Sequence, residues 1–339
     1  MAERGGAIVS PFVSLFSSTD HQNQLQWAQC YAREVRGKIR AAIRAEFQSS
    51  GQKSSRIRLA YLSADFREHA TAYLMAELFE RHDRDRFEVY AFSWGRDDGS
   101  PMRKRLEQAF DHFIDVRQMS NADVAWQMAD LGIQLAIDLM GYTKDRRSGI
   151  LAHRPAPIQV NYLGFPGTMG ADFIDYILVD SFVVPADQQP FFSEKLVHLP
   201  DCYQVNDSQR AIAEHIPTRA ECGLSEEGFV FCCFNNSYKI TPVFFDIWMR
   251  LLKAIPGSIL WLLRNTEAAE RNLRRQAQAR GIDPEFWGHF LTYHLLPGRL
   301  SLMARPVRLE YDGALYSVPT GTKGNVRQVQ ARCRYKVKQ

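Results

Sequence analysis

Residues Phe229 to Ile240 read FVFCCFNNSYKI, and this stretch is the most informative guide to the fold. The apolar run 229–234 predicts a buried strand, which leads directly into the polar turn 235–239 and then into a helix pattern at Thr241. In an open α/β sheet, ligands bind where strands end and helices begin, and the free N–H groups of a first helical turn favour an anion. Lys239 can neutralise a phosphate there as a point charge. The stretch therefore predicts a phosphate-binding turn.

Strand and helix patterns alternate on both sides of this turn. The alternation predicts an α/β fold with a mostly parallel, doubly wound sheet, followed by a second unit of the same kind. Residues 185–199 are interpreted as connecting structure. The first unit has expected strands at 57–62, 87–94, 112–116, 133–139, 158–163 and 176–179, with helices at 70–79, 101–110 and 122–131. The second unit has expected strands at 229–234 and 258–263, with helices at 242–254 and 266–280.

Apolar residues at helical spacing precede the first unit. They predict a helix over 23–47, and SSGQKSS at 49–55 has the composition of a linker. The resulting division is a helical lead-in and linker, an N-terminal Rossmann-like domain, a partial C-terminal Rossmann-like domain, and an unrelated or disordered basic tail. Their expected bounds are 1–56, 57–205, 206–284 and 285–339.

Composition is that of an ordinary globular protein, with 45% hydrophobic and 24% charged residues among 339. The net charge of +4 comes from the tail: residues 303–339 carry eight Lys or Arg against two acidic residues, so residues 1–302 carry −2. No apolar run is long enough for a membrane span, and no secretory signal is indicated. Six scattered cysteines form no CxxC pair, which argues against zinc or a disulfide framework and favours a cytoplasmic location.

Two residues that follow strands are candidates for acid–base chemistry. His69 is expected at the entry to a helix, where the helix N-terminus lowers the pKa of an imidazole and favours the neutral form that can act as a base. A surface histidine near a helix cap fits the spacing equally well. Asp138 closes the strand 133–139 and is a candidate to meet a substrate hydroxyl or to orient a base. A loop cap is the simpler interpretation of Asp138.

The glycines of LGFPGTMG at 163–170 allow the backbone to approach a ligand closely, although a tight turn also explains them. Neither GxGxxG nor GxxxxGK[ST] occurs, so no dinucleotide site or P-loop is indicated. Lys239 also has a plain alternative, a solvated surface lysine. Its neighbours Asn236 and Tyr238 on the same short turn strengthen the binding interpretation.

At these residues the chain resembles the catalytic region of the O-GlcNAc transferase family, in its bacterial form. The resemblance is dense and collinear over about residues 57–282. It is carried by IRLAYLSADFREHATAYLM at 57–75, FEVYAFSWGRDDGSPMR at 87–103, GYTKDRRSGILAHRPAPIQVNYLGFPGTMGADFIDYILVD at 141–180, SEKLVHLP at 193–200 and FCCFNNSYKI at 231–240.

The resemblance implies a GT-B fold, in which two Rossmann-like domains hold a sugar nucleotide between them. It also implies transfer of N-acetylglucosamine from UDP-N-acetylglucosamine to Ser or Thr hydroxyls of proteins, with inversion and with neither metal nor cofactor. His69 matches the histidine proposed as general base in the family. Lys239 matches the lysine that contacts the diphosphate of UDP.

Four further residues match family positions or lie beside them. Asn236 stands where many members have a glutamine that contacts the nucleotide, and Tyr238 matches the tyrosine beside the lysine. Thr143 and Gly164 match positions near the sugar and the diphosphate. Together with His69, Lys239 and Asp138, they form the candidate site.

The sequence also departs from the family pattern. No tetratricopeptide repeat is found, and the Asn-Ala/Gly-His-Thr-Thr motif expected after residue 282 does not occur. Residues 303–316, MARPVRLEYDGALY, instead resemble the start of a REP-associated tyrosine transposase. We therefore expect a truncated second domain and a transferase of impaired activity.

Three functions follow for comparison. The first is an active glycosyltransferase with a UDP-sugar and a protein acceptor as partners. The second is a catalytically dead fragment. The third is a non-enzymatic nucleic-acid binder acting through the basic tail, which we rank last because such tails are usually solvated ends.

Overall fold

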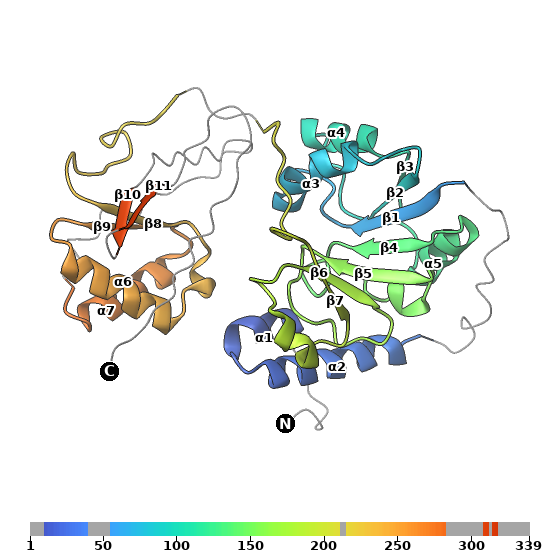
Figure 1. Cartoon of the computed structure of the whole chain (residues 1–339), viewed down its shortest axis with the longest axis horizontal. Helices are drawn as coiled ribbons and strands as arrows, with labels where there is room; N and C mark the ends of the chain where they lie inside the picture. Colours follow the sequence, from blue (N-terminus) through green and yellow to red (C-terminus); the bar gives the residue numbers. More distant parts are fainter. Residues whose placement is uncertain (1–9, 40–54, 211–214, 283–307, 312–313, 318–339) are drawn as a thin grey trace. The chain divides into compact units, whose positions relative to one another are not determined.

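The computed structural model describes residues 10–39, 55–210, 215–282, 308–311 and 314–317. By contacts the chain divides into two compact units, residues 1–210 and 211–339, and each is described on its own (Figure 1). Among the described residues, no helix combines the length and the apolar character that a membrane span requires.

A seven-stranded sheet forms the centre of the first unit. Its strand order is β3-β2-β1-β4-β5-β6-β7, and every neighbouring pair is parallel. This is the doubly wound order, so the predicted α/β class is confirmed. The strands are β1 Ile57–Ser63, β2 Phe87–Ser93, β3 His112–Asp115, β4 Leu135–Asp138, β5 Ile158–Tyr162, β6 Tyr176–Val179 and β7 Lys195–His198.

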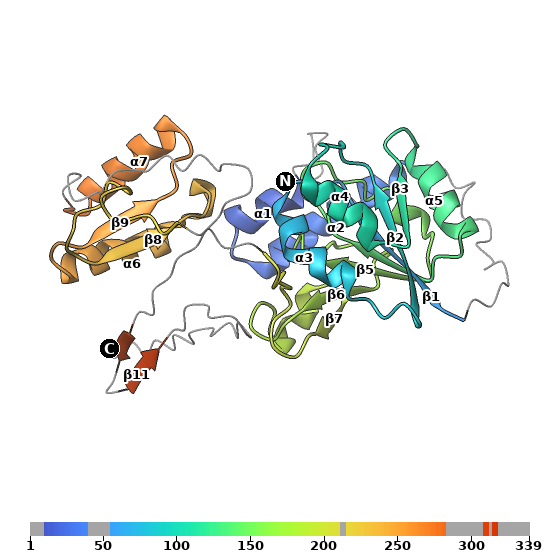
Figure 2. The same cartoon turned by 90° about the horizontal axis from the view of Figure 1, so that it is seen from above.

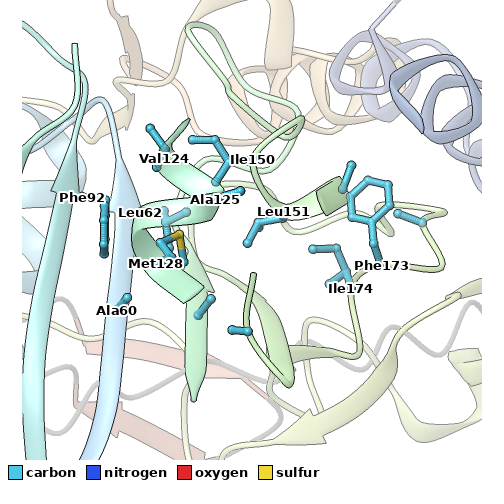
Figure 3. Packing of buried hydrophobic residues seen from close by; sticks show 14 of the residues in the cluster. Ala60, Leu62, Phe92, Val124, Ala125, Met128, Ile150, Leu151, Phe173 and Ile174 are labelled. Atoms are coloured by element: carbon cyan, nitrogen blue, oxygen red, sulfur yellow. The ribbon is translucent and has the colours of Figure 1, made fainter. Parts of the chain in front are cut away.

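Helices cover both faces of this sheet, as the two views show (Figures 1 and 2). Alternate residues of β1 point to opposite faces: Ala60 and Leu62 pack with α2 and α5, and Leu59 and Tyr61 pack with α3 and α4. Figure 3 shows part of the first cluster, where Met128 of α5 lies beside Leu62. The helices are α1 Pro11–Ser17, α2 His21–Gly37, α3 Ala70–Glu80, α4 Pro101–Ala109 and α5 Asn121–Asp130, with short 3-10 turns η2 Leu151–His153 and η3 Ala186–Phe191.

Local sequence signals set most helix starts. Ser100 and Thr241 each precede a proline and accept a backbone N–H of the first turn, which satisfies a donor that the helix itself leaves free. Ser120 forms a capping box with Asp123. Thr266 precedes helix 267–278 and accepts the N–H of Ala269 in its first turn. These caps explain why the predicted helix bounds agree closely with the structure.

The second unit contains one β-α-β element. Strands β8 Val230–Cys233 and β9 Ile259–Leu262 pair in parallel, and helix α6 Pro242–Ala254 connects them after the 3-10 turn η4 Ser237–Lys239. Helix α7 Glu267–Gln278 follows. Phe245 and Met249 of α6 are buried against Leu260 and Leu262. Residues 308–311 and 314–317 form an antiparallel pair, β10 and β11, inside the segment predicted to be a tail.

Three expectations need correction. The helical lead-in is part of the first unit, because Ala28 and Ala32 of α2 are buried in its core. The connecting segment contains β7, a short edge strand whose largely exposed residues produce no apolar alternation. Strand β8 is not fully buried: Phe231 and Cys233 pack on the α6 cluster, whereas Cys232 points to the opposite face and is exposed.

The unit boundary also differs from the expected one. The first compact unit ends at Arg210, not at residue 205. Asp207 is held by Arg105 at 2.5 Å, and Ser208 donates to the carboxylate of Glu77 at 2.7 Å, so both residues stay with the first sheet. The predicted helix 23–47 ends at Gly37 in α2, and residues 40–54 lie outside the described part. Residues 318–339 of the tail also lie outside it.

Candidate functional site

The strand order reverses between β1 and β4, since the chain adds strands on one side of β1 and then on the other. In open α/β sheets, ligands bind outside the carboxyl ends of the strands at this switch point. His69 follows β1, and Asp138 is the last residue of β4. Thr143 and Gly164 follow β4 and β5. The structure thus brings the four candidates of the first unit to one edge of one sheet.

His69 is the N-cap of α3. Its Nδ1 accepts the backbone N–H of Thr71 at 3.3 Å and lies 3.4 Å from Oδ2 of Asp65. The side chain of His69 is 38% exposed. Burial lowers the pKa of His69 from 6.5, against an opposing pull from the Asp65 charge. The neutral form, which a base requires, is therefore favoured near pH 7.

The two contacts of Nδ1 require different tautomers. When Nδ1 accepts from Thr71, the neutral ring carries its proton on Nε2, and Nε2 can only donate. When Nδ1–H points to Asp65, Nε2 has a free lone pair and can act as a base. Only the tautomer with Nδ1–H toward Asp65 leaves Nε2 able to accept a proton.

Hydrogen bonds fix the loop that carries Asp65 and His69. The N–H of Asp65 donates to Oγ of Ser63 at 2.9 Å, and the N–H of Glu68 donates to Asp98 at 2.9 Å. Burial raises the pKa of Asp65, while the nearby His69 charge opposes the rise. Asp65 is absent from the candidates predicted from the sequence, although its position four residues before His69 was a usable signal.

Asp138 is 4% exposed and lies at the end of β4 beside Leu62 of β1. Its Oδ1 accepts the N–H of Met140 at 2.8 Å, which is the arrangement of a loop cap. Burial raises the pKa of Asp138 to about 6. A carboxyl group so deeply enclosed is better placed to shape the loop after β4 than to bind a hydroxyl of a substrate.

The loops after β4 and β5 hold each other closely. A Cβ on Gly164 would lie 1.9 Å from the carbonyl oxygen of Leu139, so only glycine permits this approach. Thr143 donates its hydroxyl to the carbonyl of Met140 at 2.7 Å and is half-buried. Both residues therefore help to hold these loops in place at the edge of the sheet where a ligand would bind.

The second unit carries the remaining three candidates. Asn236 precedes η4, and Tyr238 and Lys239 belong to it, with the N–H of Lys239 donating to the carbonyl of Asn236 at 2.9 Å. All three are exposed. Thr241 then caps α6. Lys239 thus stands at the carboxyl end of β8, immediately before a helix N-terminus, as the sequence predicts.

Within the described residues, no three His, Cys, Asp or Glu side chains converge in a way that suits a metal ion. The candidates fall into two sets, one on each unit. The first holds an imidazole at a switch point, and the second holds a lysine just before a helix start. An imidazole can accept a proton, and an ammonium group can stabilise an anion.

Several known proteins are similar to this chain in sequence. The sequence is 42% identical over 235 residues to the probable UDP-N-acetylglucosamine–peptide N-acetylglucosaminyltransferase SEC of Arabidopsis thaliana, covering 68% of this chain and 24% of that protein. It is 28% identical over 347 aligned positions to the UDP-N-acetylglucosamine–peptide N-acetylglucosaminyltransferase of Caenorhabditis elegans, covering 69% and 30%. The chain thus spans about a quarter to a third of the length of these relatives.

A solved structure is also similar. A mutant of the Thermobaculum terrenum O-GlcNAc transferase superposes with a TM-score of 0.69 at 26% identity, covering 81% of this chain and 52% of that one. The sequence pattern of glycosyl transferase family 41 matches residues 5–220 and 213–287, which together take in most of the chain. This chain therefore belongs to glycosyl transferase family 41.

Proposed function

We propose that the chain carries out the O-GlcNAc transferase reaction, moving N-acetylglucosamine from UDP-N-acetylglucosamine to a Ser or Thr hydroxyl of a protein. The observation that carries the proposal is the position of His69 at the β1–β4 switch point, with Asp65 near Nδ1 and a partly exposed imidazole. Family membership and the names of the relatives support the substrate classes.

In the proposed reaction, the hydroxyl oxygen of the acceptor attacks the anomeric carbon of the sugar with inversion. The bond from that carbon to the diphosphate oxygen breaks, and its electron pair leaves with UDP. The hydroxyl proton passes to Nε2 of His69, while Nδ1–H faces Asp65. General base catalysis of this kind typically contributes about 100-fold to 10,000-fold in rate.

Lys239 has the complementary role on the second unit. Negative charge builds on the diphosphate as it leaves, and an ammonium group beside the first turn of α6 stabilises it. Losing one such contact typically costs about 3 kcal/mol of barrier. We propose that Lys239 and the helix N–H groups supply this stabilisation without a metal or a cofactor. Exposed Asn236 and Tyr238 flank Lys239 as nucleotide contacts.

The remaining parts of the proposal concern where the reaction takes place. Scattered, unpaired cysteines in the sequence favour a reducing compartment, and we propose the cytoplasm. The acceptor is a protein, and no nucleic acid takes part.

Calorimetric titration of the full chain with UDP tests the donor side. Lys239→Ala should weaken UDP binding about tenfold or more, because a charge-assisted contact is lost. Lys253→Ala is the matched control, since Lys253 is an exposed lysine near the other end of α6. Equal UDP affinity in both variants would contradict the assigned role of Lys239.

Transfer of labelled sugar to an acceptor peptide tests the other side. His69→Ala should abolish transfer and leave UDP affinity unchanged, because His69 and Lys239 lie on different units. Transfer that persists at the wild-type rate in His69→Ala would refute the base assignment.

A further inference from the structure

A cavity of about 380 Å³ opens in the first unit between α2 and the loop after β4. Its lining includes Arg146 and Arg147 of that loop, Asn121 at the start of α5, and Tyr31 and Val35 of α2. None of these residues belongs to the candidate transferase site described above. The cavity has one polar wall and one apolar wall.

The two arginines of the polar wall contact only uncharged groups. Arg147 donates from Nε to the amide oxygen of Asn121 at 2.8 Å and from Nη1 and Nη2 to the carbonyls of Val116 and Met119 at 3.0 and 2.7 Å. Arg146 donates to the Tyr31 hydroxyl and to the Thr143 carbonyl. In the described part of the chain, no carboxylate lies within ion-pair distance of either guanidinium.

Other enclosed arginines of this unit differ in this respect. Arg103 pairs with Glu107 at 2.7 Å, and Arg105 pairs with both Glu80 and Asp207. The usual arrangement gives a partly buried guanidinium an acidic partner. Arg146 and Arg147 differ from these arginines, because neither has an acidic partner among the described residues.

Donors and charge remain available in the cavity. An arginine has five N–H donors, and the three hydrogen bonds of Arg147 described above use three of them, which leaves one each on Nη1 and Nη2. Lys38 also lines the cavity and pairs with Glu34 at 2.8 Å, and the lining includes the carboxylate of Asp145. Burial lowers the pKa of Arg147, which indicates that its charge is poorly compensated. His153 also lines the cavity, and its buried Nδ1 has no hydrogen-bond partner among the described residues.

The apolar part of the lining is a stripe of side chains that begins at Tyr31, whose ring lies 5.0 Å from the Arg146 guanidinium. Tyr31, Val35 and Ile39 recur at every fourth residue, so they lie on one side of α2 and its C-terminal extension. All three pack partly against the core and present the rest of their surface to the cavity. An apolar group entering the cavity would meet this stripe while its charged end met the arginines.

We propose that this cavity binds a small organic anion, with a phosphate or carboxylate group held by Arg146 and Arg147 and an apolar body against Tyr31, Val35 and Ile39. The volume suits a ligand of about the size of one amino acid or one sugar phosphate. The proposal does not depend on the transferase reaction, because the cavity shares none of the residues assigned to it.

Titration calorimetry of the full chain with inorganic phosphate and with phenyl phosphate tests the proposal. Phenyl phosphate should bind about tenfold more tightly than inorganic phosphate, because its ring reaches the apolar stripe. Arg146→Gln should weaken both ligands about tenfold through loss of a charge-assisted contact. Arg117→Gln is the matched control, because Arg117 is already neutralised by Asp115 and should have no effect.

Two more variants keep the test decisive. Lys38→Glu reverses an exposed charge at the cavity and should weaken phosphate binding about fivefold even if Arg146→Gln does not fold. Lys253→Ala, at an exposed lysine outside both sites, should leave phosphate binding unchanged. The proposal is overturned if the chain binds no phosphate, if binding follows Lys239 rather than Arg146, or if phenyl phosphate gains nothing over phosphate.

Discussion

The buried carboxyl of Asp138 makes a quantitative prediction about stability and pH. Replacing it by asparagine keeps an oxygen that accepts the N–H of Met140 and removes the titration. Burial raises the pKa of Asp138 from 3.8 in the unfolded chain to about 6 in the folded one. The folded wild type therefore binds more protons than the unfolded chain between these values, and its stability falls as pH rises through them.

The size of this effect follows from the pKa difference. A shift of about 2 pKa units corresponds to about 3 kcal/mol of unfolding free energy, at 1.36 kcal/mol for each unit. Most of this loss occurs between pH 4.5 and pH 7, where it amounts to about 2 kcal/mol. Asp138→Asn does not undergo this loss. The unfolding free energy of the variant minus that of the wild type should thus rise by about 2 kcal/mol over this range.

Urea unfolding of both proteins at a series of pH values measures this difference. Any constant cost of burying the asparagine amide cancels, because only the change with pH is used. Glu77→Gln is an informative control, since hydrogen bonds from Ser208 lower the pKa of Glu77 to about 2. The stabilisation that the Glu77 carboxylate contributes is present above pH 4.5 and is lost as the pH falls below it. Its pH dependence therefore has the opposite sign to that of Asp138. A difference for Asp138→Asn that stays flat or falls with rising pH would refute the burial argument.

Two further predictions concern the same edge of the sheet. In thermal unfolding, Gly164→Ala should lower the unfolding free energy by about 3 kcal/mol, because its Cβ would collide with the Leu139 carbonyl. Gly37→Ala should be neutral or raise the unfolding free energy by up to about 1 kcal/mol, because no atom lies within 4 Å of its added Cβ. Equal effects of the two glycine changes would show that the close approach is not real. Asp65→Asn should slow sugar transfer about tenfold or more and move the acid limb of the pH–rate profile to lower pH, because the Asp65 charge raises the pKa of His69. An unmoved profile would remove Asp65 from the mechanism.

Much of the fold is predictable from the sequence because its signals are local. Helix α6 has the predicted bounds, since Thr241 and Pro242 mark its start. Strand β7 is missed, since at the sheet edge most of its residues are exposed and no alternation of apolar residues appears. Cys232 is assigned to the core wrongly, because an apolar run does not reveal which face of the strand a second layer covers.

The candidate site was likewise predictable from the sequence only in part. The sequence places His69 and Lys239 after strands, at helix starts, and the structure has them there. Nothing in the sequence separates a ligand contact from a packing contact at Gly164, and the closeness of Leu139 appears only in three dimensions. The meeting of Asp65 with Nδ1 of His69 likewise needed the folded loop.

By itself, the sequence determined the family, the alternation of strands and helices, and the caps that start each helix, because these depend on residues close along the chain. Tertiary structure decided the strand order and therefore the switch point that sets His69 beside the end of β4. It also decided the burial that raises the pKa of Asp138. The cavity in which Arg146 and Arg147 lack an acidic partner among the described residues depends on the tertiary structure as well. Pairing and burial depend on contacts between distant segments, and such contacts leave no periodic trace in the sequence.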